Sequence, residues 1–250
     1  MTRTLATNTM KKSTFLRAEW RNLIFANYEI DPKILEKYLP FGTELDLWQG
    51  KCFVSVVGFD FRETAVLGIK FPFHTNFEEV NLRFYVRHKE GNQWKRGVVF
   101  IKEIVPRFMI TLIANTLYKE NYATHKTKKH IQATEKELIF RYEWLNKKHW
   151  NFLEVTTEIA KQNILAGSEE EFITEHYWGY AYANDQQTTE YEVVHPKWQI
   201  HQVKEFKIEA DFIDLYGEEF SFLANAQPSS VFMADGSKVA ILGGKTIKAV

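Results

Sequence analysis

Apolar and polar side chains alternate over much of the chain, and this alternation constrains the fold more than any other feature. In FEEVNLRFYVRH (77–88), Val80, Leu82, Phe84 and Val86 project to one side of an extended strand. The pattern predicts strands at 52–63, 80–88, 96–104, 137–145, 152–160, 171–183, 189–195 and 202–210. Polar turns, among them KEGNQ (89–93) and ADGS (234–237), separate several of them. The sequence therefore predicts a mainly β protein whose antiparallel sheet is closed or packed in two layers.

Helices are expected to be few. The segment 30–40 has Asp31 as N-cap, Pro32 at the first helical position and Pro40 as a stop. The segment 209–217 fits one short helix, and 106–120 fits a helix or a strand. No repeat or linker divides the chain, so we expect a flexible N-terminal tail over 1–14 and a single domain over 15–250.

Composition excludes several classes of protein. Aromatic residues make up 15% of the chain, which favours β structure. The 32 basic and 32 acidic side chains cancel, so nothing points to nucleic acid. The lone Cys52 fits a reducing compartment, and we find neither a secretory signal nor an apolar run of the ~18 residues that a membrane span needs. We expect a cytoplasmic protein, and a homo-oligomeric state stays open.

The common catalytic and cofactor motifs are absent. The Gly-Lys-Thr near the C-terminus lacks the earlier glycine of a phosphate loop, because position 239 is Val. Neither an HExxH nor a paired CxxC motif is present, and the histidines lack metal-ligand spacing. Ser168 is not in a GxSxG elbow. We therefore expect no metal and no cofactor.

The other side of 77–88 carries a polar row of Glu79, Asn81, Arg83 and Tyr85. One face of an antiparallel sheet is commonly solvated, so this row is compatible with a surface. Two features favour the interior instead: the row has no lysine, and it carries charges of both signs. Since alternate residues lie about 6.6 Å apart, Glu79 and Arg83 could each reach the amide between them or a shared ligand.

The order of several segments resembles that of the YqjF-like family, an uncharacterised bacterial family distantly related to acetoacetate decarboxylase. The segments are 20–61, FEEVNLRFYV (77–86), GVVFIKEI (97–104), FITEHYWGYAY (172–182) and VVHPKW (193–198). The resemblance implies a cone-like antiparallel β-barrel with a few helices and an internal cavity. It also implies that Glu79 corresponds to an acidic residue lining the decarboxylase pocket.

The decarboxylase nucleophile has no counterpart in this sequence. The decarboxylase forms a Schiff base through a lysine in a Pro-Lys-Lys segment. The corresponding stretch, LYKENYATHKTKK (117–129), places Asn121, Tyr122 and Ala123 at those positions. Lys119 and Lys126 lie in a polar run, where a solvated lysine stays protonated at neutral pH. We therefore do not expect acetoacetate decarboxylase activity.

The candidate site combines a possible catalytic group, Glu79, with eight residues expected to bind a ligand: Asn81, Arg83, Tyr85, Tyr118, Tyr122, Glu175, His195 and Trp198. Each has a plainer interpretation. Arg83 could pair with Glu79, His195 could only shape a turn, and at most one of Glu175 and His176 would face inward.

Three functions remain open. The first is a protein that binds a small carbonyl- or carboxylate-bearing metabolite, held by Arg83 with aromatic walls around it. The second is a lyase- or hydrolase-type enzyme that uses Glu79 as general acid or base. The third is a non-catalytic interaction protein.

Overall fold

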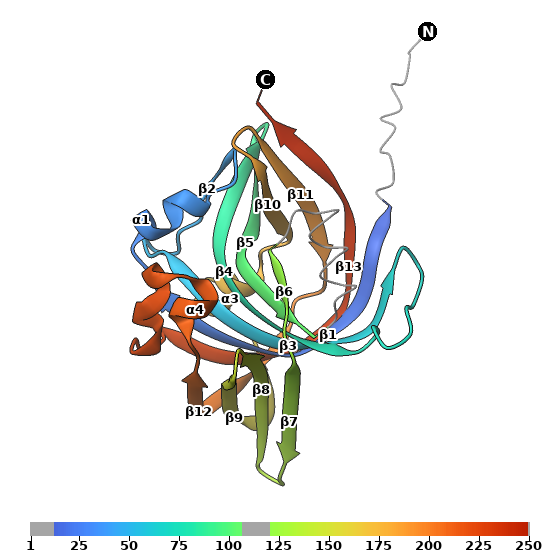
Figure 1. Cartoon of the computed structure of the whole chain (residues 1–250), viewed down its shortest axis with the longest axis vertical. Coiled ribbons are helices and arrows are strands. Elements are labelled where there is room, and N and C mark those ends of the chain that lie inside the picture. Colours follow the sequence, from blue (N-terminus) through green and yellow to red (C-terminus); the bar gives the residue numbers. More distant parts are fainter. Residues whose placement is uncertain (1–12, 107–120, 250) are drawn as a thin grey trace.

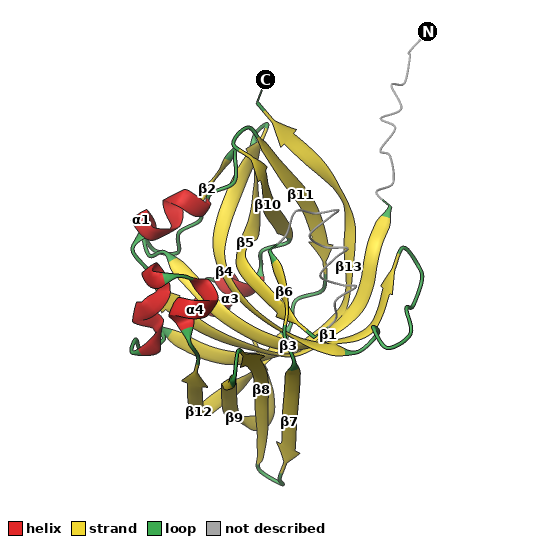
Figure 2. Ribbon diagram, viewed as in Figure 1, coloured by secondary structure: helices red, strands yellow, loops and turns green. Residues whose placement is uncertain are grey.

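A computed structural model describes residues 13–106 and 121–249, which form a closed seven-stranded β-barrel with a second sheet attached (Figures 1 and 2). The barrel strands pair in the order β1-β3-β4-β5-β10-β11-β13, and β13 pairs with β1 to close the ring. Their bounds are β1 Thr14–Glu29, β3 Phe53–Val66, β4 Phe77–Glu90, β5 Gln93–Val105, β10 Trp178–Asn184, β11 Gln187–Val194 and β13 Ser230–Lys248. The predicted mainly β, closed sheet is confirmed.

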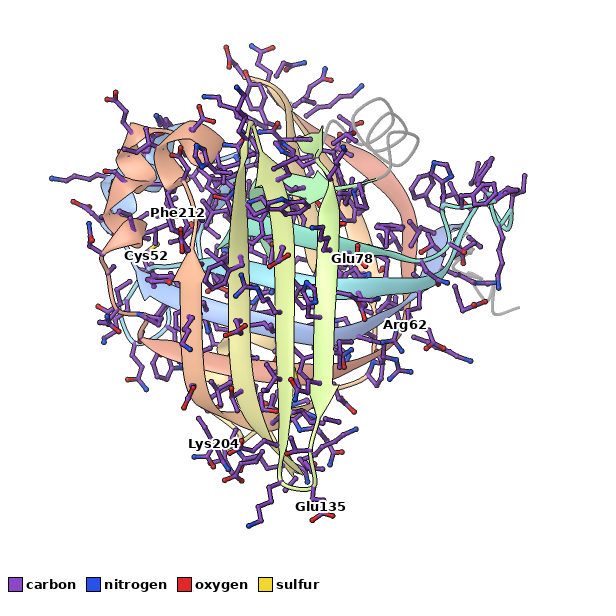
Figure 3. The ribbon with its side chains drawn as sticks, turned by 60° about the horizontal axis from the view of Figure 1, so that its bottom comes forward. Cys52, Arg62, Glu78, Glu135, Lys204 and Phe212 are labelled. Carbon is purple, nitrogen blue, oxygen red and sulfur yellow. The ribbon has the colours of Figure 1, made fainter. Side chains whose placement is uncertain are left out.

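The second sheet lies across the outside of the barrel. Its strands are β12 (Gln199–Glu209), β9 (His149–Asn163), β8 (Glu137–Asn146) and β7 (Thr127–Ala133), and β12 joins it to β13. Figure 3 shows these four strands crossing over the barrel strands β1, β3 and β4. The apolar row of β4 packs in this layer, with Leu82 in the same core cluster as Tyr142 and Leu153. The outer face of β4 is therefore covered, and the polar row must face the barrel interior.

The helices among the described residues are few and short, as predicted. The segment predicted at 30–40 forms α1 (Pro32–Leu35) and the 3-10 helix η1 (Glu36–Tyr38). The Asp31 carboxylate caps α1 by accepting a hydrogen bond from the Lys33 amide at 3.0 Å. The helix predicted at 209–217 is α4 (Phe212–Tyr216), and the 3-10 helix η2 (Glu218–Ala224) follows it. Of the segment 106–120, all but Pro106 lies outside the described residues.

The barrel closes at a narrow seam between β5 and β10. These strands pair in parallel at two positions, Trp178 with Gly97 and Gly179 with Val98. A Cβ atom on Gly97 would lie 2.6 Å from the Trp178 carbonyl oxygen, and one on Gly179 would lie 2.1 Å from the Tyr191 ring. The far half of β5 pairs instead with β6 (Tyr122–Thr124). Glycine at 97 thus lets β5 approach the backbone of β10, and glycine at 179 leaves room for the Tyr191 ring of β11.

Two predicted elements are wrong. The strand predicted at 171–183 begins as a helix, α3 (Glu169–Thr174), and becomes a strand only at Trp178. The Ser168 hydroxyl caps α3 by accepting from the Glu171 amide at 3.2 Å, and the acidic residues of the first turn favour a helix start. The turn predicted at ADGS (234–237) lies inside β13, where Gly236 has a φ of 77°.

The structure describes only the last two residues of the predicted N-terminal tail, 13 and 14. Residues 1–12 of the predicted tail lie outside the described residues, whereas Thr14 already starts β1. Two more strands complete the described chain: β2 (Thr43–Leu45) pairs with β4, and β6 pairs with β5. Among the described residues, no helix has the length and apolar character that crossing a membrane would require.

Candidate functional site

Three residues of the polar row of β4, Glu79, Asn81 and Arg83, face a cavity inside the barrel. Glu79 and Asn81 are 2% and 1% exposed, and Arg83 is partly buried. These three residues line a cavity of about 60 Å³, which is enough for several waters or a small ligand. Much of the wall is aromatic, formed by Trp20, Phe59, Phe61, Phe100, Trp178 and Trp198. A few polar groups in an aromatic enclosure are typical of a small-molecule site.

One end of the cavity is acidic and is built by three neighbouring strands. Strand pairing places Glu103 of β5 opposite Asn81 of β4, and Tyr122 of β6 opposite Glu103. The Asn81 amide donates to Glu79 Oε1 at 2.9 Å, and the Tyr122 hydroxyl donates to Glu79 Oε2 at 3.3 Å. The predicted contact between Glu79 and the neighbouring amide is therefore present, and Tyr122 joins it from a distant part of the chain.

Burial changes the acid–base behaviour of Glu79. Removal from water raises its pKa from 4.5 to about 7, although hydrogen bonds from Asn81 and Tyr122 and the charge of Arg83 oppose the rise. Burial also raises the pKa of Tyr122, and the neighbouring Glu103 and Glu79 carboxylates raise it further, so this phenol stays protonated. Near neutral pH, the Glu79 carboxyl group can therefore both give up and accept a proton.

Arg83 carries a positive charge without an anionic partner. Within the described residues its guanidinium forms no ion pair, and its Nε atom is buried without a hydrogen-bond acceptor. Its contacts are with aromatic rings, since Cζ lies 5.1 Å from the centre of the Phe25 ring and 5.6 Å from that of Tyr85. The interpretation that Arg83 simply pairs with Glu79 is wrong, because Glu79 is held by Asn81 and Tyr122 instead.

A histidine forms another part of the wall. His176 lies in the connection between α3 and β10, and its side chain is 1% exposed. Its Nε2 atom lies 3.1 Å from Asp46 Oδ2, and Arg96 Nε donates to the same oxygen at 2.6 Å. Burial lowers the pKa of His176 from 6.5 to about 4, which outweighs the opposing influence of Asp46. The imidazole is therefore neutral at pH 7.

The remaining predicted residues are divided between the cavity and other places. His195 and Trp198 both line the cavity and stack on one another, with ring centres 4.2 Å apart. Tyr85 is buried behind the wall, where its hydroxyl is 2.7 Å from Ser55 Oγ. Glu175 lies outside the cavity and accepts a hydrogen bond from Tyr177 at 2.7 Å, so His176 is the inward member of that pair. Tyr118 lies outside the described residues.

Sequence reasoning missed Glu103 and Trp20 and named His176 only as the alternative to Glu175, and all three line the cavity. Within the described chain, Trp20 Nε1, Asn81 Oδ1 and His176 Nδ1 are buried without a hydrogen-bond partner, as is Arg83 Nε. Buried polar atoms without partners are rare in native proteins. These four atoms belong to residues that line one cavity.

The wall offers neither an imine-forming amine nor a metal site in the part of the chain that the structure describes. None of the described lining side chains is a lysine. Lys126 is exposed, and Lys119 lies outside the described residues. No group of three His, Cys, Asp or Glu side chains among the described residues is arranged to hold a metal ion.

Comparison with solved structures identifies the fold. Acetoacetate decarboxylase from Legionella pneumophila superposes with a TM-score of 0.65 at 14% identity, covering 99% of this chain and 92% of that one. An acetoacetate decarboxylase-like enzyme from Sphingomonas wittichii RW1 gives 0.64 at 12% identity, covering 98% and 99%. The enduracididine biosynthesis enzyme MppR, complexed with a condensation product of pyruvate, gives 0.64 at 11% identity over 97% of this chain and 92% of its own. The barrel is therefore of the acetoacetate decarboxylase type, as the resemblance implied.

Comparison of sequences identifies the family. The uncharacterized protein YqjF of Bacillus subtilis (strain 168) is 28% identical over 123 residues. That match covers 48% of this chain and 49% of the relative, so the chain spans about half the length of the curated protein it matches. The family DUF2071, described as an uncharacterized conserved protein, matches residues 17–238. Because this match covers nearly the whole barrel, the chain belongs to the DUF2071 family.

Proposed function

We propose that the barrel cavity binds a small metabolite that carries a carboxylate, and that Arg83 is the group that holds it. The observation that carries this proposal is a guanidinium in the cavity wall that forms no ion pair among the described residues and whose Nε has no hydrogen-bond acceptor. A buried charge without a partner is costly, and a carboxylate matches the planar fork of arginine with two parallel hydrogen bonds.

The surroundings of Arg83 limit the size and chemistry of the ligand. A cavity of about 60 Å³ admits only a few heavy atoms unless side chains move. The aromatic walls suit a short carbon skeleton, and Glu79 and Asn81 supply hydrogen bonds at the acidic end. The similar barrel of MppR has been observed complexed with pyruvate, a small carboxylate, which supports the same class of ligand here.

Titration with short carboxylic acids, including pyruvate, lactate and propionate, tests this proposal. A ligand at 100 times its dissociation constant adds about 2.7 kcal/mol to the free energy of unfolding, which a melting experiment detects. We expect Arg83→Gln to abolish the effect. Arg87→Gln is a matched control, because Arg87 lies on the same strand but pairs with Glu44 outside the cavity. Equal stabilisation of wild type and Arg83→Gln by the acids would refute the proposal.

A second candidate is an enzyme of the lyase or hydrolase type in which Glu79 transfers protons to and from the bound ligand. The observation that favours it is the pKa of Glu79, about 7, because a general acid–base group works best near the operating pH. Glu79→Gln should then retain binding, measured by the same melting shift, and lose turnover of whichever acid the wild type converts. If the wild type binds acids but converts none, the enzymatic candidate is refuted and only the binding function stands.

A further inference from the structure

The immediate surroundings of His176 fix the position of its proton. The Asp46 carboxylate is 5% exposed and accepts from Arg96 Nε at 2.6 Å. Burial raises the pKa of Asp46, but hydrogen bonds and charges from His176 and Arg96 lower it by more, so Asp46 is a carboxylate at pH 7. A neutral imidazole beside a carboxylate places its single N–H on the nitrogen that faces the carboxylate. His176 Nε2 therefore donates to Asp46, and Nδ1 keeps its lone pair.

No group among the described residues donates a hydrogen bond to that lone pair. His176 Nδ1 is buried without a hydrogen-bond partner, and the residue lines the cavity. Neighbouring rings hold the imidazole in place, with the Tyr85 ring centre at 4.8 Å and the Phe172 ring centre at 5.0 Å. The ring is thus fixed by Asp46 on one edge and by aromatic contacts on its sides, and its other nitrogen has no hydrogen-bond partner among the described residues.

Arg83 and His176 both line the cavity and both contact the Tyr85 ring. The Arg83 Cζ atom is 5.6 Å from the centre of this ring. The positive charge of Arg83 contributes to lowering the pKa of both His176 and Glu79, so the guanidinium lies within electrostatic reach of both groups. A carboxylate on Arg83 would accordingly share the cavity with the histidine acceptor.

We propose that His176 Nδ1 accepts a hydrogen bond from a hydroxyl group on the carbon next to the carboxylate held by Arg83, so that the cavity selects 2-hydroxy acids over 2-oxo acids. This inference rests on the proposed binding of a carboxylate. A 2-oxo acid presents a carbonyl oxygen to the same nitrogen, and two acceptors facing one another cannot form a hydrogen bond. Asp46 is a positioning residue, because it acts on the ligand only through the imidazole.

Lactate, pyruvate and propionate separate the possible outcomes, since they share three carbons and a carboxylate and differ at one substituent. Isothermal titration calorimetry of the full chain at pH 7 should give a dissociation constant for lactate at least tenfold lower than for pyruvate or propionate. His176→Phe should abolish the preference while retaining binding through Arg83. His130→Phe is the control, because His130 is an exposed residue of β7, and should keep the preference.

A measurement on the wild-type protein without ligand tests the inference even if His176→Phe does not fold. Nitrogen-15 NMR of the wild-type protein should show His176 neutral at pH 7 with its proton on Nε2. A proton on Nδ1, or a charged ring, would overturn the inference. Equal or tighter binding of pyruvate would also overturn it and leave the proposed carboxylate binding intact. Binding of none of the three acids would overturn both.

Discussion

Replacing Glu79 with glutamine should change how the stability of the protein depends on pH. The Glu79 side chain is buried in the barrel, and its carboxylate receives two hydrogen bonds but no ion pair within the described residues. Burial raises its pKa from 4.5 to about 7. Glutamine retains an oxygen that can accept from Asn81 but never becomes charged. The variant therefore removes the titration and keeps most of the packing.

The sign and size of the effect follow from proton linkage. Between pH 4.5 and 7 the folded protein holds a proton on Glu79 that the unfolded chain has lost. The unfolded state thus binds fewer protons, and the stability of the wild type falls as the pH rises. Each pKa unit corresponds to about 1.4 kcal/mol, so the total loss is roughly 3 kcal/mol, complete above the folded pKa. Below pH 4.5 both states are protonated, and the contribution is fully present.

Urea denaturation from pH 4 to pH 8.5 measures this effect. We expect the free energy of unfolding of Glu79→Gln to gain about 3 kcal/mol on that of the wild type across this range, by the same linkage. Glu78→Gln is a suitable control: Glu78 is the preceding residue of β4 and accepts from Thr127 on the outer layer, so this variant keeps Glu79 and should keep the wild-type trend. A difference between wild type and Glu79→Gln that is constant with pH would refute the reasoning.

Three further predictions concern the scaffold. Gly179→Ala places a methyl group 2.1 Å from the Tyr191 ring, and we expect it to lower the free energy of unfolding by about 1–3 kcal/mol in urea. Cys52 is 4% exposed and burial raises its pKa to about 11, so a thiol-specific disulfide reagent at pH 8 should modify the native protein far more slowly than the urea-unfolded chain. Asp31→Ala should cost about 1 kcal/mol by removing the cap of α1, and Asp31→Ser should recover most of it in the same denaturation experiment.

Local patterns predicted individual strands well, because each pattern reports which side of a strand is apolar. The row on β4 was identified in this way, and the outer layer confirms that its apolar side packs against other strands. The order in which the strands pair could not be predicted from local patterns, since β1 and β13 close the barrel across more than 200 residues of sequence. The strand β1 was not predicted at all. Its WRNLIFANYE segment contains a change of register against β3 between Arg21 and Ile24, which breaks the alternation.

Glu103 shows why a site residue can escape a period-two pattern. On β5, Val98 and Phe100 line the cavity, so strict alternation would place Lys102 inside and Glu103 outside. The pairing with β4 shifts between Phe100 and Lys102, a β-bulge that inserts one residue and reverses the faces beyond it. Glu103 then faces the cavity, and Lys102 points outward to the Leu215 carbonyl. Alternation also could not decide between Glu175 and His176, because both residues lie in the connection between α3 and β10 rather than in a strand.

The proposed binding of a small acid would give the buried polar side chains of this barrel hydrogen-bond partners that the described protein does not supply. Antiparallel strands can expose one face to water, but β4 is covered on both, so its polar row loses hydration. Burying polar atoms without partners destabilises a fold, and apolar residues of similar shape would fill the same space at no such cost. Yet Arg83 Nε, Asn81 Oδ1 and His176 Nδ1 all belong to the wall of one cavity. In the proposed function, the guanidinium donor and the two acceptors would pair with a small acid that bears its own hydrogen-bond donor.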